Sequence, residues 1–191
     1  MPQPESAINN STSVVTKVLH FGIAAGVIAQ LIIGDKMQKP RPGRPEDPLF
    51  EWHEFIGLAT LALLMIYWVW AWRRSGEKAF GAFFPWFSSA RLGELWSDTK
   101  SHLAAMKRGA LPPPEDLPLP SALHGLGIIC ATLLAASGAI GYFIKPLGFV
   151  LEIHAPFVTP MWAYLIGHVV MAMWHELRGD RIIGRMLRVW R

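Results

Sequence analysis

The chain has 191 residues, of which 52% are hydrophobic and 17% are charged. Because a soluble domain usually carries about 25% charged residues, this composition argues against disordered, fibrous and ordinary soluble proteins. The single cysteine, Cys130, excludes an internal disulfide, a cysteine-ligated iron–sulfur cluster and a cysteine-rich zinc site, and no C-x-x-C-H motif is present to attach haem covalently.

The apolar residues are concentrated in four blocks, each about as long as the 20 residues that cross the hydrocarbon core of a bilayer. The blocks cover residues 14–33, 52–72, 121–144 and 155–174. We therefore predict an all-α fold, an integral membrane four-helix bundle, formed as one domain over residues 1–191. Buried core helices of a soluble protein are the disfavoured alternative, because too few residues remain to surround them.

The basic residues are unevenly distributed between the two sides of such a bundle. Four spans place the N-terminus, the loop 73–120 and the tail 177–191 on one side, and that side holds 13 of the 18 Lys and Arg residues. Basic loops stay in the cytoplasm, so we expect a multi-pass membrane protein with both termini cytoplasmic. The net charge of +4 then reflects a basic membrane face, and we expect no nucleic acid partner.

Two segments outside the spans have helical spacing. Residues 88–108 place several large apolar side chains on one broad face, and the arginines of the tail 177–191 recur at steps of three and four. We expect both segments to be amphipathic helices at the cytoplasmic membrane surface. For the tail, a solvated helix or contact with a partner subunit are alternatives.

Six of the seven histidines lie in or at the ends of the spans, where ionisable side chains are costly and usually functional. Because the spans alternate in direction, His20 and His168 lie at a similar depth near the cytoplasmic side. His53 and His154 both lie near the outer side. His154 and His168 are 14 residues apart, which is nearly four helical turns, so they face nearly the same way about 21 Å apart.

Two imidazoles from facing helices at one depth are what a bis-histidine haem requires. The spans also contain many glycines, which let helices approach closely and leave room for a planar ring. A zinc or copper transporter would normally place carboxylates or thiolates at mid-depth, and spans 121–144 and 155–174 contain no carboxylate.

Three further histidines have less defined roles. His124 and His175 lie near the cytoplasmic side, where either of them is a candidate to hold a haem propionate, to line a quinone pocket or to replace His168 as ligand. His102 lies in the loop 73–120, and we expect it to be solvated.

The ordered set of histidines resembles the bacterial cytochrome b561 and nickel-hydrogenase b-type cytochrome family over roughly residues 14–178. The residues that carry this resemblance are His20, "WHEFIG" at the start of the second span, "LHGLG" at the start of the third, and "EIH" followed by "IGH" in the fourth. The resemblance implies a di-haem electron carrier of the bacterial inner membrane that exchanges electrons with quinone. Carried over by position, His20 and His168 would hold the cytoplasmic-side haem, and His53 and His154 the outer one.

We therefore expect transmembrane electron transfer by two non-covalent b haems, with the quinone pool as substrate and membrane lipid as surroundings. The chain would act alone, as an electron-transfer protein, or as the membrane subunit of a quinone oxidoreductase with a redox partner protein, and an oligomer is possible. One alternative is a non-redox membrane anchor that recruits a soluble partner, and another is a cation transporter.

Overall fold

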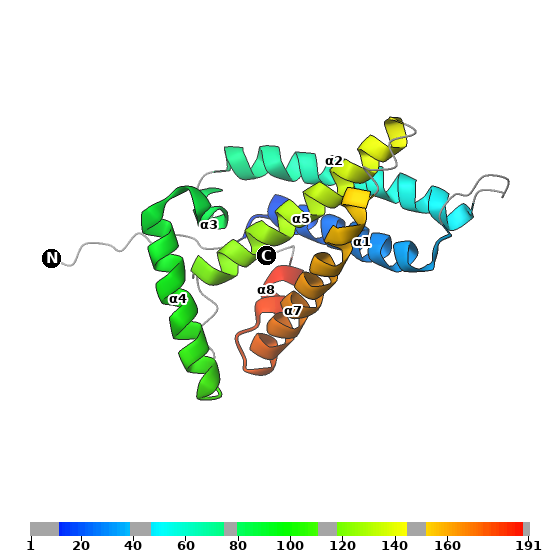
Figure 1. Cartoon of the computed structure of the whole chain (residues 1–191). Helices are drawn as coiled ribbons and strands as arrows, with labels where there is room; N and C mark the ends of the chain where they lie inside the picture. The colour runs from blue at the N-terminus through cyan, green and yellow to red at the C-terminus, as the bar shows by residue number, and fades with distance from the viewer. Residues whose placement is uncertain (1–11, 39–46, 75–79, 111–117, 145–151, 189–191) are drawn as a thin grey trace.

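Four long apolar helices make up most of the protein in the computed structural model, which describes residues 12–38, 47–74, 80–110, 118–144 and 152–188 (Figure 1). They are α1 (Val14–Lys36), α2 (Pro48–Arg73), α5 (Pro118–Phe143) and the span Glu152–Leu177. The last span contains a 3-10 turn, η2 (Ala155–Phe157), followed by α7 (Val158–Leu177). The predicted all-α class with four spans is confirmed, and the chain is a multi-pass membrane protein.

Polar residues cap the starts of α1 and α2, and α2 begins four residues before its apolar block. In α1 the Ser13 hydroxyl accepts a hydrogen bond from the Thr16 N–H at 3.2 Å. In α2 the Asp47 carboxylate accepts from the Leu49 N–H at 3.0 Å, and Pro48 occupies the first turn, where a missing N–H costs nothing.

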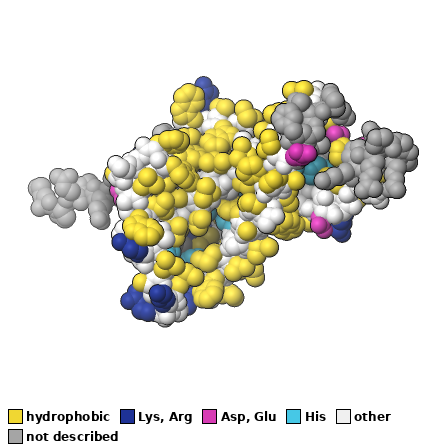
Figure 2. All heavy atoms as spheres, viewed as in Figure 1, with side chains coloured by type: hydrophobic (Ala, Val, Ile, Leu, Met, Phe, Trp, Pro, Cys, Tyr) yellow, Lys and Arg dark blue, Asp and Glu magenta, His cyan; other side chains and the backbone are white. Residues whose placement is uncertain are grey.

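All four spans meet in a small core. Ile23 of α1, Leu64 of α2, Ala131 of α5 and Met161 of α7 are buried against one another, and Leu64 and Met161 are fully enclosed. Most other large apolar side chains of the spans are exposed at the surface of the chain, and Figure 2 shows them covering most of the visible face. In a membrane these side chains contact lipid, so their exposure costs nothing.

The spans are packed unevenly. Gly26 of α1 lies so close to Thr60 of α2, and Gly127 of α5 so close to the ring of Tyr164 of α7, that a Cβ atom would overlap the neighbour. Close packing joins α1 to α2, α2 to α5 and α5 to α7, whereas α7 makes few backbone contacts with α1 or α2. The side of the bundle between α7 and the first two helices is thus the loosely packed one.

The loop between α2 and α5 forms helices of its own: α3 (Phe80–Phe83), the 3-10 turn η1 (Pro85–Phe87) and α4 (Ser89–Lys107). Figure 1 shows α4 crossing one end of the bundle at a steep angle to α2. One oxygen of Asp98 accepts from the Leu119 N–H at the start of α5 at 2.8 Å, and the other lies 3.0 Å from His102 Nδ1. The prediction that His102 is solvated is therefore wrong, since its side chain is only 12% exposed.

This attachment turns a mixed side of α4 toward the bundle, with Asp98 and His102 beside the buried Ala105, and leaves an apolar stripe exposed. The stripe consists of Leu92, Trp96, Leu103 and Met106. The predicted helix is confirmed, and its position at the membrane surface stays a prediction.

The tail forms a shorter helix than its spacing predicts. After α7 ends at Leu177, Gly179 has φ 96° and Arg181 has φ 50°, which breaks the helix. The following helix, α8, covers only Ile182–Leu187, and the Glu176 carboxylate accepts from the Ile183 N–H at 2.8 Å at its start.

Candidate functional site

The structure brings four of the histidines together as two pairs, each joining two different helices. His20 of α1 faces His168 of α7, with ring centres 6.2 Å apart and planes inclined at 54°. His53 of α2 faces His154, which precedes η2, with ring centres again 6.2 Å apart and planes inclined at 78°. These are the pairs expected from depth along the spans, and both lie on the loosely packed side of the bundle.

The spacing of the rings can be compared with what a shared metal ion requires. An imidazole nitrogen binds a transition metal at about 2.0–2.1 Å and lies about 1.1 Å from the centre of its own ring. Two imidazoles on opposite sides of one metal ion therefore have ring centres about 6.3 Å apart. Both observed distances of 6.2 Å agree with this value, which also falls within the range of about 4.5–7 Å found for ring pairs in direct contact.

The two rings of the His53–His154 pair are each positioned by a glycine of a neighbouring helix. A Cβ atom on Gly34 would lie 3.3 Å from Cε1 of His53, and one on Gly138 would lie 3.5 Å from Cε1 of His154. In both rings the edge formed by Cε1 and Nδ1 is the one that faces the glycine. Nε2 of each ring lies more than 4 Å from the position of that Cβ atom.

Helix α5 also fixes the orientation of His154 by hydrogen bonds. Its Nδ1 lies 2.9 Å from the Leu134 carbonyl oxygen and 3.1 Å from the Ser137 hydroxyl. The carbonyl can only accept, so Nδ1 carries the proton and Nε2 keeps its lone pair for a metal. A metal-binding histidine commonly has this arrangement, because the second bond sets its tautomer and direction. On the other side of the pair, Gln30 Nε2 donates to the His53 carbonyl oxygen at 2.7 Å and ties α1 to α2 at this depth.

In each pair, one imidazole has a buried nitrogen without a hydrogen-bond partner among the described residues. Nδ1 of His20 and Nδ1 of His53 are buried and have no hydrogen-bond partner within the part of the chain that the structure describes. A buried polar atom without a partner costs about 1–3 kcal/mol. One imidazole of each pair therefore retains hydrogen-bonding capacity that the described residues do not use.

Two more side chains surround His168. The ring of Tyr164 stacks on it at 5.6 Å with planes inclined at 17°, and the ring of His124 meets it edge to face at 4.8 Å. Nδ1 of His124 lies 2.7 Å from the Pro120 carbonyl oxygen of its own helix. A distance of 4.8 Å is too short for a metal ion between the rings, so His124 contacts His168 directly and supports its position.

His175 lies apart from these pairs, at the end of α7. Its Nδ1 is 2.8 Å from a carboxylate oxygen of Asp180, and its side chain is only 11% exposed. Along an α-helix it stands about 10 Å beyond His168, so it is poorly placed to face His20.

Two histidines at each site fit a haem better than a metal ion bound by protein side chains alone. Among the described residues no three His, Cys, Asp or Glu side chains are grouped to hold an ion. Protein sites for zinc need three or four such ligands, whereas haem brings four nitrogens of its own and needs two axial residues. Figure 2 shows a hollow in the apolar surface with histidine side chains at its margin, on a face where an apolar macrocycle could lie.

Sequence analysis did not identify some of the residues that position these histidines. Ser137 and Gly34 act through contacts between helices. The only sequence signal for Ser137 is a hydroxyl beside Gly138 in an otherwise apolar span, and this signal is common in membrane helices.

Comparison with known families agrees with the geometry. Residues 11–188 match the family described as prokaryotic cytochrome b561, and the chain belongs to that family. No curated protein and no solved structure matches the chain. The resemblance noted in the sequence is thereby confirmed, and family membership implies a b-type cytochrome that binds haem and transfers electrons in the membrane.

Proposed function

We propose that this prokaryotic cytochrome b561 carries electrons across the membrane through two non-covalent b haems and exchanges them with the quinone pool. The two histidine pairs with equal ring-centre distances of 6.2 Å are the observation that carries the proposal. When bound, haem b supplies one-electron redox chemistry between the ferric and ferrous states.

In this proposal His20 and His168 would hold one haem, and His53 and His154 would hold the other. The hydrogen bond from His154 Nδ1 to the Leu134 carbonyl raises the basicity of the ring and fixes its direction. Tyr164 and His124 hold the ring of His168 by direct contact. Exposed apolar side chains around the spans keep water away from both sites and exclude it from the path between them.

Quinone exchange would take place near the end of α7. A quinone takes up protons together with electrons, so its site needs a group that can hand over a proton. His175 Nδ1 lies 2.8 Å from a carboxylate oxygen of Asp180, and these two side chains would supply that group at this end. A soluble or membrane redox partner would meet the other haem, whether the chain acts alone or as a subunit.

The orientation in a bacterial inner membrane is also proposed, with both termini and α4 in the cytoplasm. The excess of basic residues on that side supports it, since 13 of the 18 Lys and Arg residues lie there.

Purified protein is expected to be red and to contain two b haems per chain. Pyridine haemochrome analysis against quantitative amino-acid analysis measures this ratio, and a reduced-minus-oxidised spectrum shows that both haems are redox-active. One haem per chain in intact protein would contradict the two-site assignment. A colourless protein would favour a membrane anchor instead.

Cysteine labelling is expected to show opposite locations for Lys36 and Lys100. Both side chains are exposed, Lys36 at the end of α1 and Lys100 on α4. In a Cys130→Ser background, a membrane-impermeant maleimide should label Lys36→Cys in intact cells and Lys100→Cys only after lysis. Labelling of Lys100→Cys before lysis would reverse the proposed orientation.

A further inference from the structure

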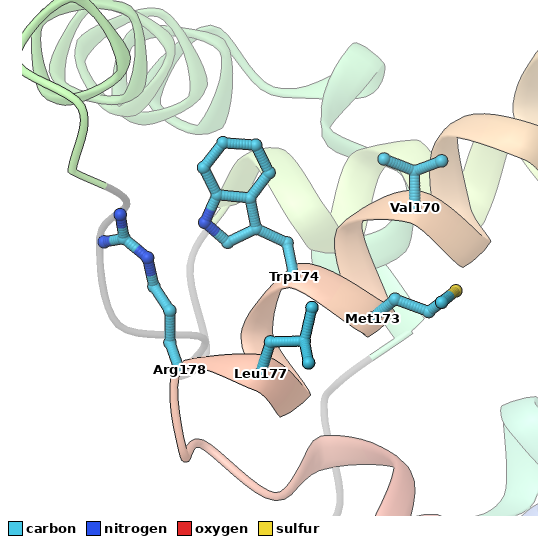
Figure 3. Close-up of a pocket in the computed structure, with 5 residues that line it drawn as sticks. All are labelled: Val170, Met173, Trp174, Leu177 and Arg178. Atoms are coloured by element: carbon cyan, nitrogen blue, oxygen red, sulfur yellow. The ribbon is translucent and has the colours of Figure 1, made fainter.

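A groove on the outward surface of α7 combines an apolar lining with one cationic end. It is lined by Val170, Met173, Trp174, Leu177 and Arg178 and has a volume of about 420 Å³ (Figure 3). The four apolar side chains are between 46% and 86% exposed, so nothing in the described part of the chain covers them. In a membrane span such a groove opens toward the acyl chains of the bilayer.

Arg178 is held at the mouth of this groove by two contacts. Its guanidinium lies 5.6 Å from the centre of the Trp174 ring, and one N–H donates to the Gly109 carbonyl oxygen at 2.7 Å. Figure 3 shows the Trp174 and Arg178 side chains on the same side of α7. The bond to Gly109 uses one of five guanidinium N–H groups and leaves the planar fork suited to a phosphate.

The same bond joins Arg178 to the end of α4, which carries further positive charge. Gly109 directly follows Lys107 and Arg108, both exposed at the end of α4. The two carboxylates closest in sequence to Arg178 have other partners, because Glu176 accepts from the Ile183 N–H and Asp180 is paired with His175. Arg178 therefore lines an apolar groove at the end of a membrane span, and Lys107 and Arg108 directly precede the glycine that it contacts.

We propose that this groove binds one anionic phospholipid, such as phosphatidylglycerol. Its phosphate would be held by Arg178, Lys107 and Arg108, and an acyl chain would lie along Val170, Met173 and Leu177. A groove of about 420 Å³ has the size of a small-molecule site and is too small for a protein helix. Basic pockets at the ends of membrane helices bind anionic headgroups, with each Lys or Arg contributing a several-fold preference.

Native mass spectrometry of the full haem-loaded chain, released from nanodiscs that contain equal amounts of phosphatidylglycerol and phosphatidylcholine, tests the proposal. The unmodified protein should retain one phosphatidylglycerol in preference to phosphatidylcholine. Arg178→Gln should weaken this retention about fivefold, and the triple change with Lys107→Gln and Arg108→Gln about a hundredfold. The absorption spectrum of the haems should stay unchanged, which shows that each variant is folded.

Lys100→Gln is the matched control, because it removes the same charge from α4 at a side chain that lies 5.9 Å from the Trp96 ring and does not line the groove. Equal loss of phosphatidylglycerol in Lys100→Gln and Arg178→Gln would overturn the proposal. Equal retention of the two lipids by the unmodified protein would also overturn it. So would the finding that Arg178→Gln loses a bound quinone or peptide and no phosphatidylglycerol.

Discussion

Replacing His168 with alanine is expected to halve the haem content of the protein. The proposed inner site would lose one of its two axial imidazoles, while the His53–His154 pair would remain intact at 6.2 Å. Electron paramagnetic resonance should show the loss of one low-spin haem signal and the persistence of the other. His154→Ala should remove the complementary signal, because its ring faces His53 and is held by Leu134 and Ser137.

Two neighbouring histidines provide the controls for this prediction. His175→Ala should retain both low-spin signals, because His175 is paired with Asp180 about 10 Å further along α7. His124→Ala should also retain both, with a shift in the inner signal, since its ring contacts that of His168 at 4.8 Å. If His175→Ala loses a signal while His168→Ala keeps both, the assignment of His168 is wrong. The signal that persists in each single variant shows that the bundle is still folded.

The fold and the approximate depth of the histidines could be predicted from the sequence for a physical reason. Lipid offers no hydrogen-bond partner to backbone N–H and C=O groups. A membrane-spanning stretch of about 20 apolar residues therefore has to form a helix, in which these groups bond to one another. The fixed helical rise then converts position in the chain into depth. This reasoning placed His20 near His168 and His53 near His154, and the structure brings the same residues together even though η2 interrupts the last span.

The rotation and packing of the helices could not be predicted in the same way. Whether Ser137 faces His154 depends on how α5 is turned about its axis, and that is set by contacts such as Gly127 against Tyr164. The amphipathic spacing of α4 likewise indicated a helix but did not show that Asp98 caps α5 and holds His102. Apart from the Asp98–His102 contact within α4, these contacts join residues far apart in the sequence, and no local pattern encodes them.

Replacing Gly34 with leucine is expected to remove the haem of the His53–His154 pair without changing any ligand. A Cβ atom alone would lie 3.3 Å from Cε1 of His53, so the larger side chain would have to displace the ring. The side chains that bind one metal ion tolerate shifts of only about 0.5 Å. A displaced His53 ring can therefore no longer bind the same iron as His154. Haem content should fall by half, with the loss of the low-spin signal that His154→Ala also removes. Gly34→Ala should have a much smaller effect, because a small rotation of the ring can accommodate a methyl group.

Gly167→Leu is the matched control for Gly34→Leu. Gly167 is the residue before His168, and a Cβ atom there would meet nothing within 4 Å among the described residues, so leucine should be accommodated and both haems retained. Both changes replace a helical glycine by a good helix former, which favours the helix by roughly 1 kcal/mol. Loss of haem in Gly34→Leu alone therefore cannot arise from a weakened helix. If Gly34→Leu retains both low-spin signals, the ring of His53 does not depend on Gly34 for its position, and the close approach of α1 at this point has no part in holding the haem.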